Sequence, residues 1–84
     1  MSKWNKLLIQ ILQGRSDANI RFDDLCGLLR AFGFEERVRG GHHIFRMTGV
    51  AERINLQKDG NKAKVYQVSQ VRRVLVNYKL GELD

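Results

Sequence analysis

The side chains with the clearest capacity for chemistry stand in one short segment of the 84-residue chain, residues 39–46, which reads RGGHHIFR. Side chains alternate across a strand, so His42 and Arg46 share one face and His43 and Phe45 share the other. Because Phe45 belongs in a core, we expect His43 to lean toward the interior and His42 to stand on an open face. The two glycines before His42 leave the backbone bare, so a phosphate or ribose can approach closely.

A histidine beside arginine on an open sheet face favours cleavage of RNA. RNA supplies its own nucleophile, the 2′-hydroxyl, so the enzyme needs a group that transfers a proton and positive charge around the phosphate. Imidazole exchanges its proton near neutral pH, and a guanidinium binds phosphate oxygens in pairs. We therefore take His42 as the first catalytic candidate and His43 as the second. The alternative is that the exposed histidine is inert.

A metal centre at this histidine pair is the poorer interpretation. Adjacent histidines of one strand point to opposite faces, so His42 and His43 cannot easily chelate one ion, and we expect no cysteine or acidic cluster beside them. The sequence contains no phosphate-binding loop of the Walker type and no evident Ser-His-Asp arrangement. The expected chemistry therefore needs no metal and no cofactor.

Two helices are predicted before this segment. The first runs from about residue 3 to 13, where Trp4, Leu7, Leu8 and Ile11 form one apolar stripe. The second begins after residue 22, with Asp23 as its predicted N-terminal cap, and Gly33 follows it where a left-handed cap is expected.

Three strands and a last helix follow. We expect strands at residues 37–39, 42–47 and 53–57, with a Gly40-Gly41 hairpin turn and a turn or loop at 58–61. A helix is predicted from residue 66 or 67 to 79. The expected fold is α+β, a single domain in the order α-α-β-β-β-α, whose three-stranded antiparallel sheet carries the helices on one face.

The chain is strongly basic, with 15 lysines and arginines against 9 aspartates and glutamates. Such an excess favours polyanionic partners, either a nucleic acid or an acidic protein. The residues predicted to contact RNA are Arg39, Gly40, Gly41, Arg46, Lys62, Lys64, Arg72 and Arg73. For each of these side chains alone, a solvated charged surface is the simpler interpretation.

The cysteine content and the hydropathy of the sequence indicate the cellular compartment to expect. Cys26 is the sole cysteine, so no internal disulfide can form, which suits a reducing cytoplasm. We expect Cys26 to be a small core side chain. No apolar run approaches the roughly 20 residues of a membrane span, so no membrane association is expected.

The segment Gly40-Gly41-His42-His43-Ile44-Phe45-Arg46 resembles the Gly-Ser-His-His-x-Phe motif of HicA toxins. Residues 32–34 before it and the helix at 67–74 are also similar to that family, so the resemblance covers residues 22–80. It implies a fold like that of double-stranded RNA-binding domains and the activity of a metal-independent mRNA endoribonuclease. It also implies a type II toxin–antitoxin system with a HicB-type antitoxin, and it places the catalytic histidine at His42.

The sequence departs from the family pattern in three ways. The His-Pro element common late in the family's third strand is missing, since the chain contains no proline. Gly41 stands where the family usually has serine, which removes a hydroxyl donor near the scissile phosphate and favours, as the alternative function, a non-catalytic RNA-binding module. Residues 1–20 form an extra N-terminal helix that either contacts the antitoxin, supports a homo-oligomer or simply adds to the core.

Overall fold

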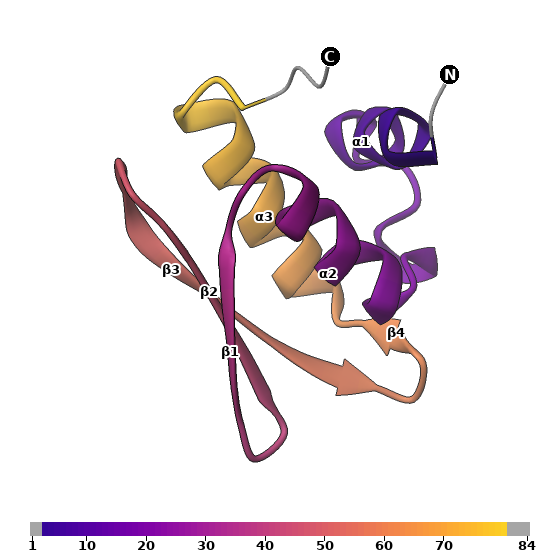
Figure 1. Ribbon diagram of the computed structural model, residues 1–84. Helices are drawn as coiled ribbons and strands as arrows, with labels where there is room; N and C mark the ends of the chain where they lie inside the picture. Colours follow the sequence, from indigo (N-terminus) through magenta and orange to yellow (C-terminus); the bar gives the residue numbers. More distant parts are fainter. Residues whose placement is uncertain (1–2, 81–84) are drawn as a thin grey trace.

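The computed structural model describes residues 3–80 of the chain. Three α-helices and four strands follow one another, with a short 3₁₀ helix between the first two α-helices (Figure 1). Their bounds are α1 (Lys3–Gln13), η1 (Asp17–Asn19), α2 (Phe22–Ala31), β1 (Glu35–Arg39), β2 (His42–Met47), β3 (Val50–Asp59), β4 (Lys62–Ala63) and α3 (Val65–Asn77). None of the helices within residues 3–80 is long and apolar enough to cross a membrane.

The helix α2 begins one residue before the predicted cap. Arg21 occupies the N-cap position and Phe22 is the first helical residue, so the assignment of the cap to Asp23 was wrong. Phe22 is buried with Leu25 and Leu29, three and seven residues further along. This apolar stripe draws Phe22 into the helix, and Asp23 lies in the first turn, where a carboxylate is still favourable. Gly33, with φ of +100°, ends the segment as predicted.

The four strands form one antiparallel sheet in the order β1-β2-β3-β4. The turn between β1 and β2 is the predicted Gly40-Gly41 pair, and Gly40 has a left-handed φ of +57°. The predicted loop at 58–61 is only partly a loop, because β3 continues to Asp59 and the chain turns into β4. A two-residue strand is too short to show alternation, which is why the sequence pattern missed β4.

The helices lie together on one face of the sheet and leave the other face open (Figure 1). The core between the layers includes Phe45 from β2, Ile54 and Leu56 from β3, and the apolar faces of the three helices. Trp4 of α1 packs on Gly27 of α2, where even a methyl group would meet the indole. This arrangement confirms the predicted α+β class and the α-α-β-β-β-α layout, with β4 as an addition.

Two side chains fix α3 in the fold, one against the sheet and one against the N-terminal elements. Gln67 is buried, and in the amide orientation that satisfies both groups it accepts from the Gln57 N–H at 3.0 Å and donates to the Gln57 carbonyl at 3.2 Å. The amide thus pairs with the backbone of β3 as a neighbouring strand would. Arg72 binds both carboxylate oxygens of Asp17, at 3.0 and 2.7 Å, and the Ile11 carbonyl. Gln67 thus holds the start of α3 against β3, and Arg72 joins the middle of α3 to α1 and η1.

Candidate nucleic-acid interface

The two adjacent histidines lie in different environments on opposite faces of the sheet. His42 is exposed on the open face. His43 is partly buried on the helix side, where its ring meets the Phe22 ring edge-on at a centroid distance of 4.9 Å. This is the arrangement that strand alternation predicts. The two imidazoles therefore cannot act on the same bound phosphate.

The orientation of the His42 ring is set by Asn55 on the neighbouring strand. His42 Nδ1 lies 3.2 Å from Asn55 Oδ1. Because an amide oxygen can only accept, Nδ1 carries the hydrogen of this bond, and Nε2 of the neutral ring keeps its lone pair. Nε2 has no hydrogen-bond partner within residues 3–80. The ring of His42 is thus oriented so that Nε2 can accept a proton on the side away from Asn55.

Four arginines lie on the same open face as His42, and one of them is its direct neighbour. Arg39 is the cross-strand partner of His42, and Glu35 is the partner of Arg46. Side chains that face each other across antiparallel strands lie about 4.5–5.5 Å apart at Cβ, so Arg39 and His42 are immediate neighbours. Arg37 and Arg53 extend the same face, by register and by alternation with Asn55.

These four arginines, Arg37, Arg39, Arg46 and Arg53, are called the arginine face below. None of them forms an ion pair or a side-chain hydrogen bond in the described part of the chain. They line, with Ile44 and the glutamates of β1, a hollow of about 390 Å³. Glu36 contributes little charge there, because Arg30 and His43 bind its carboxylate, and the one other carboxylate of the lining, Glu35, offsets a single arginine. A hollow with free guanidinium groups is suited to phosphate oxygens.

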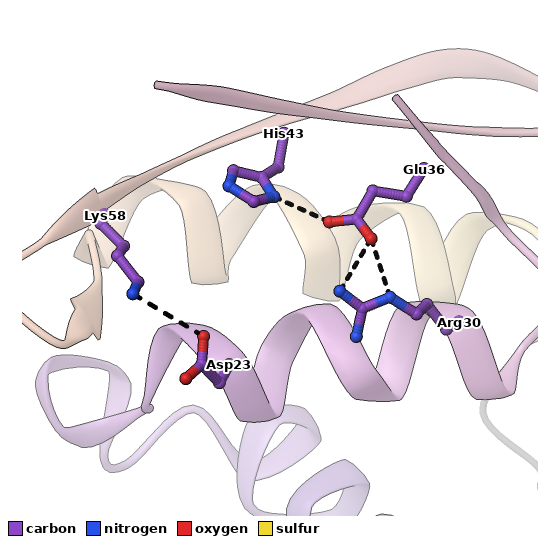
Figure 2. A network of polar contacts seen from close by, with 5 residues as sticks. All are labelled: Asp23, Arg30, Glu36, His43 and Lys58. Atoms are coloured by element: carbon purple, nitrogen blue, oxygen red, sulfur yellow. Dashed lines mark hydrogen bonds and ion pairs between the residues drawn. The ribbon is translucent and has the colours of Figure 1, made fainter. Parts of the chain in front are cut away.

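On the helix side, His43 belongs to a polar cluster that joins α2 to the sheet (Figure 2). His43 Nδ1 binds Glu36 Oε2 at 2.7 Å, and the Arg30 guanidinium binds Glu36 Oε1 at 2.7 and 2.8 Å. Cys26 also lies here, because its sulfur and the ligand atoms of Glu36 and His43 are all within 4.8 Å of one another. The expectation that no cysteine stands near the histidines was therefore wrong for His43, and one carboxylate, that of Glu36, lies there as well. Residues from α2 and β1 meet β2 only through packing, so spacing along the chain could not reveal this.

The chemistry of the cluster favours a structural role over metal binding. Burial raises the pKa of the Cys26 thiol to about 12, so the thiol keeps its proton at neutral pH. A metal ion would need the thiolate and would compete with Arg30 for Glu36. In the cluster, His43 and Arg30 instead donate hydrogen bonds to the partly buried Glu36 carboxylate.

Acid should weaken this cluster. Burial alone would raise the pKa of Glu36, but hydrogen bonds from His43 and Arg30, with the charge of Arg30, hold it below the ordinary value of 4.5. A depressed folded-state pKa stabilises the fold above pH 4.5, and this contribution disappears as the pH falls through the lower folded value. We expect Glu36→Gln to lower the free energy of unfolding at pH 7 by about 1 kcal/mol.

That difference between the wild type and Glu36→Gln should shrink toward zero at about pH 3, below the ordinary carboxyl range. Urea unfolding at both pH values measures it, with Glu35→Gln as the matched control because Glu35 is exposed and faces the open side. An equal destabilisation at both pH values would show that the ionised carboxylate is not what stabilises the cluster.

The other residues predicted to contact RNA are spread over the molecule. Gly40 and Gly41 form the turn beside the arginine face. Arg72 is committed to Asp17 and is therefore not available for phosphate without breaking that pair. Lys62 donates to Asn19 at 3.3 Å, and Lys64 precedes α3, while Arg73 is exposed on α3. The structure thus groups Arg39, Arg46 and the glycines with His42 and leaves the other four elsewhere.

Three residues of the site were not predicted from the sequence. Arg37 and Arg53 face the same side as His42, and Asn55 orients its ring. Alternation within the two flanking strands could have found the arginines once the register was known. The hydrogen bond of Asn55 depends on a β2–β3 pairing that sequence alone does not fix.

Comparison with protein-family models, curated proteins and solved structures found no match to this chain.

Proposed function

We propose that this protein is a metal-independent endoribonuclease that cleaves mRNA with His42 as its catalytic residue. The observation that carries the proposal is the exposed His42 ring, held through Nδ1 by Asn55 and flanked by the arginine face. RNA cleavage needs a proton acceptor and positive charge, and on the described open face the Nε2 atom of His42 and the arginines provide these two requirements. The similarity of residues 40–46 to the HicA motif supports the same activity.

The proposed reaction is an intramolecular transfer within RNA. Nε2 of His42 takes the proton of a ribose 2′-hydroxyl, and the 2′-oxygen forms a bond to the adjacent phosphorus. The bond from phosphorus to the 5′-oxygen of the next nucleotide breaks, and that oxygen takes a proton from water. The products are a 2′,3′-cyclic phosphate and a 5′-hydroxyl end. Arg39, the cross-strand neighbour of His42, stabilises the negative charge that gathers on the phosphate oxygens, and the other arginines of the arginine face bind neighbouring phosphates.

Asn55 acts as a positioning residue in this scheme. It accepts from Nδ1, so the neutral ring presents its lone pair at Nε2 rather than at Nδ1. His43 lies behind the sheet and supports the fold through Glu36. The proposal therefore assigns catalysis to His42 alone.

The biological setting that fits this activity is a cytoplasmic type II toxin–antitoxin system. An uncontrolled mRNA nuclease needs an inhibitor, and the arginine face offers an acidic protein a complementary surface. We propose a HicB-type antitoxin as that partner, bound over His42. The exposed end of the molecule at α1 is a second surface for such a protein or for another copy of this chain.

Chelation tests the metal-free chemistry directly. The purified protein should cleave a single-stranded RNA equally well with and without a millimolar excess of EDTA, because the proposed base is an imidazole. Gel analysis of end-labelled RNA measures the rate, and a metal-dependent ribonuclease in the same buffer controls for the chelator. Cleavage that stops with EDTA and returns with a divalent ion would overturn the mechanism.

Serine at position 41 should increase the cleavage rate. Gly41 has no left-handed φ, and a Cβ built there would meet only Gln57 Nε2, at an ordinary 3.7 Å. Gly41→Ser therefore fits without strain and adds a hydroxyl donor beside the phosphate. One hydrogen bond to a charged group is worth about 1.5–3 kcal/mol, so we expect a gain of roughly tenfold or more in kcat/KM.

The matched control is Gly41→Ala, which adds the same Cβ without the hydroxyl and should leave the rate near the wild-type value. If the wild-type protein binds RNA without cleaving it and Gly41→Ser restores cleavage, the present chain is the non-catalytic RNA-binding module. Equal cleavage rates for the serine and alanine variants would show that the hydroxyl does not contribute to catalysis.

A further inference from the structure

A pocket adjoins His42 on the side opposite Arg39. It measures about 250 Å³ and lies between β3 and the first turns of α3, lined by His42, Asn55, Gln57, Tyr66, Gln67 and Gln70. We propose that this pocket binds one unpaired nucleobase of the RNA, next to the phosphate that is cleaved. The inference deepens the nuclease proposal and rests on it for the position of that phosphate.

Register places the pocket and the phosphate site on either side of the imidazole. Arg39 of β1 faces His42, and His42 in turn faces Gln57 of β3. The guanidinium is therefore on one flank of the catalytic ring and the pocket on the other. A nucleotide has the same division, with a charged phosphate at one end and a neutral base at the other. A nucleotide with its phosphate at Arg39 and its base in the pocket places its ribose at His42.

Tyr66 supplies the surface on which a base can stack. It is the second residue of α3 and is 64% exposed, although the pocket lies beside it. Exposed aromatic rings at the edge of a basic surface are the usual stacking partners of unpaired bases. The position of Tyr66 is fixed from behind, because its neighbour Gln67 is buried and bound to the backbone of β3.

The amides of the pocket can read the edge of a base. Asn55 uses Oδ1 for His42, which leaves its amide N–H groups without a partner among residues 3–80. Within the same residues Gln70 uses only one amide N–H, in a long contact of 3.5 Å to the Arg53 carbonyl. Primary amides offer both donors and acceptors, as the Watson–Crick edge of a base does. A charged ligand finds no counter-ion among these six side chains, whereas a neutral heterocycle finds complementary groups.

The size of the pocket favours unpaired RNA over duplex RNA as the substrate. Its volume of about 250 Å³ is below the roughly 300–1,000 Å³ of sites for drug-sized ligands, which suits a single planar base better than a base pair. The substrate class is therefore single-stranded RNA, cleaved with a preference for the base at one position beside the scissile bond. A double-stranded substrate of the same sequence has no base free to enter.

The test uses short oligoribonucleotides in which one nucleotide is varied through all four bases. Fully 2′-O-methylated copies lack the nucleophile and so report binding without cleavage. We expect the full-length wild-type protein to favour one base, and Tyr66→Ala to bind the favoured methylated oligonucleotide about tenfold more weakly. Tyr66→Phe keeps the stacking surface and should stay within about twofold of the wild type. Val76→Ala, an exposed site on the same helix, is the matched control.

The outcomes separate this inference from the nuclease proposal. Binding that depends on Tyr66 in a protein that cleaves no RNA would support the pocket and contradict the nuclease. Cleavage without base preference, unchanged in Tyr66→Ala, would support the nuclease and overturn the pocket. A protein that binds none of the oligonucleotides overturns both. Gln70→Ala gives a second readout, because it should reduce the discrimination among bases while Tyr66 still supports binding.

Discussion

Replacing His42 with alanine should reduce the rate of RNA cleavage by about 10²–10⁴-fold, the usual contribution of a positioned acid–base group. The loss follows because no other described side chain on the open face combines a proton-accepting atom with this position. The fold should be unaffected, because His42 is exposed and exposed substitutions usually change stability by less than about 0.5 kcal/mol. Single-turnover cleavage of a labelled RNA measures the effect, with thermal unfolding of the variant in parallel.

Two further variants distinguish the ring from its neighbours. His42→Gln keeps an amide donor for Asn55 and similar bulk but has no proton acceptor of suitable basicity, so it should be as inactive as alanine. His43→Ala removes the partner of Glu36 and the edge contact with Phe22, so it should lower stability while the folded fraction still cleaves. Full activity in both His42 variants, with loss in folded His43→Ala, would transfer the catalytic role to the other face.

Removing charge from the arginine face should weaken RNA binding and flatten its dependence on salt. Each phosphate contact to single-stranded nucleic acid contributes about 0.7 to the slope of log K against log salt. Four contacts predict that affinity falls by about fiftyfold as salt rises from about 50 to about 200 mM. The double variant Arg39→Gln, Arg46→Gln should lose roughly half of that slope, because two of the four counter-ion releases are gone.

The control for this prediction changes net charge by the same amount elsewhere. Lys6→Gln with Arg15→Gln removes two exposed cations from α1 and the segment after it, on the helix side of the molecule. Fluorescence anisotropy of a labelled, uncleavable oligonucleotide across a salt series measures both double variants. An equal change of slope in the two would mean that overall charge, rather than the arginine face, determines binding.

Much of the fold follows from periodicity within single segments. The stripe of Trp4, Leu7, Leu8 and Ile11 predicts α1, and its predicted bounds match the structure. The alternation in residues 42–47 gives both the bounds of β2 and the opposite orientation of the two histidines. These features depend on neighbours within a few residues, which a sequence displays directly. The start of α2 was misplaced because Phe22 enters the core as part of the helix.

The site depends on contacts between segments, and there the sequence carries less information. Asn55 lies 13 residues from His42 and meets it only through the register of β2 with β3. Arg72 is a basic helix residue like Arg73, yet it closes a pair with Asp17, 55 positions away, and so serves the fold. Charge and residue type alone cannot separate these two arginines. Packing makes the distinction, because it places Arg72, partly buried, beside a carboxylate.

The chemical identity of the RNA ends tests the central claim most directly. The wild-type protein, with EDTA present, should convert a defined oligoribonucleotide into fragments with 2′,3′-cyclic phosphate and 5′-hydroxyl ends. Mass spectrometry of the fragments identifies these ends, and His42→Gln prepared in the same way should yield none of them. Fragments with 5′-phosphate ends, or the same cyclic ends from His42→Gln at the wild-type rate, would contradict catalysis by this imidazole.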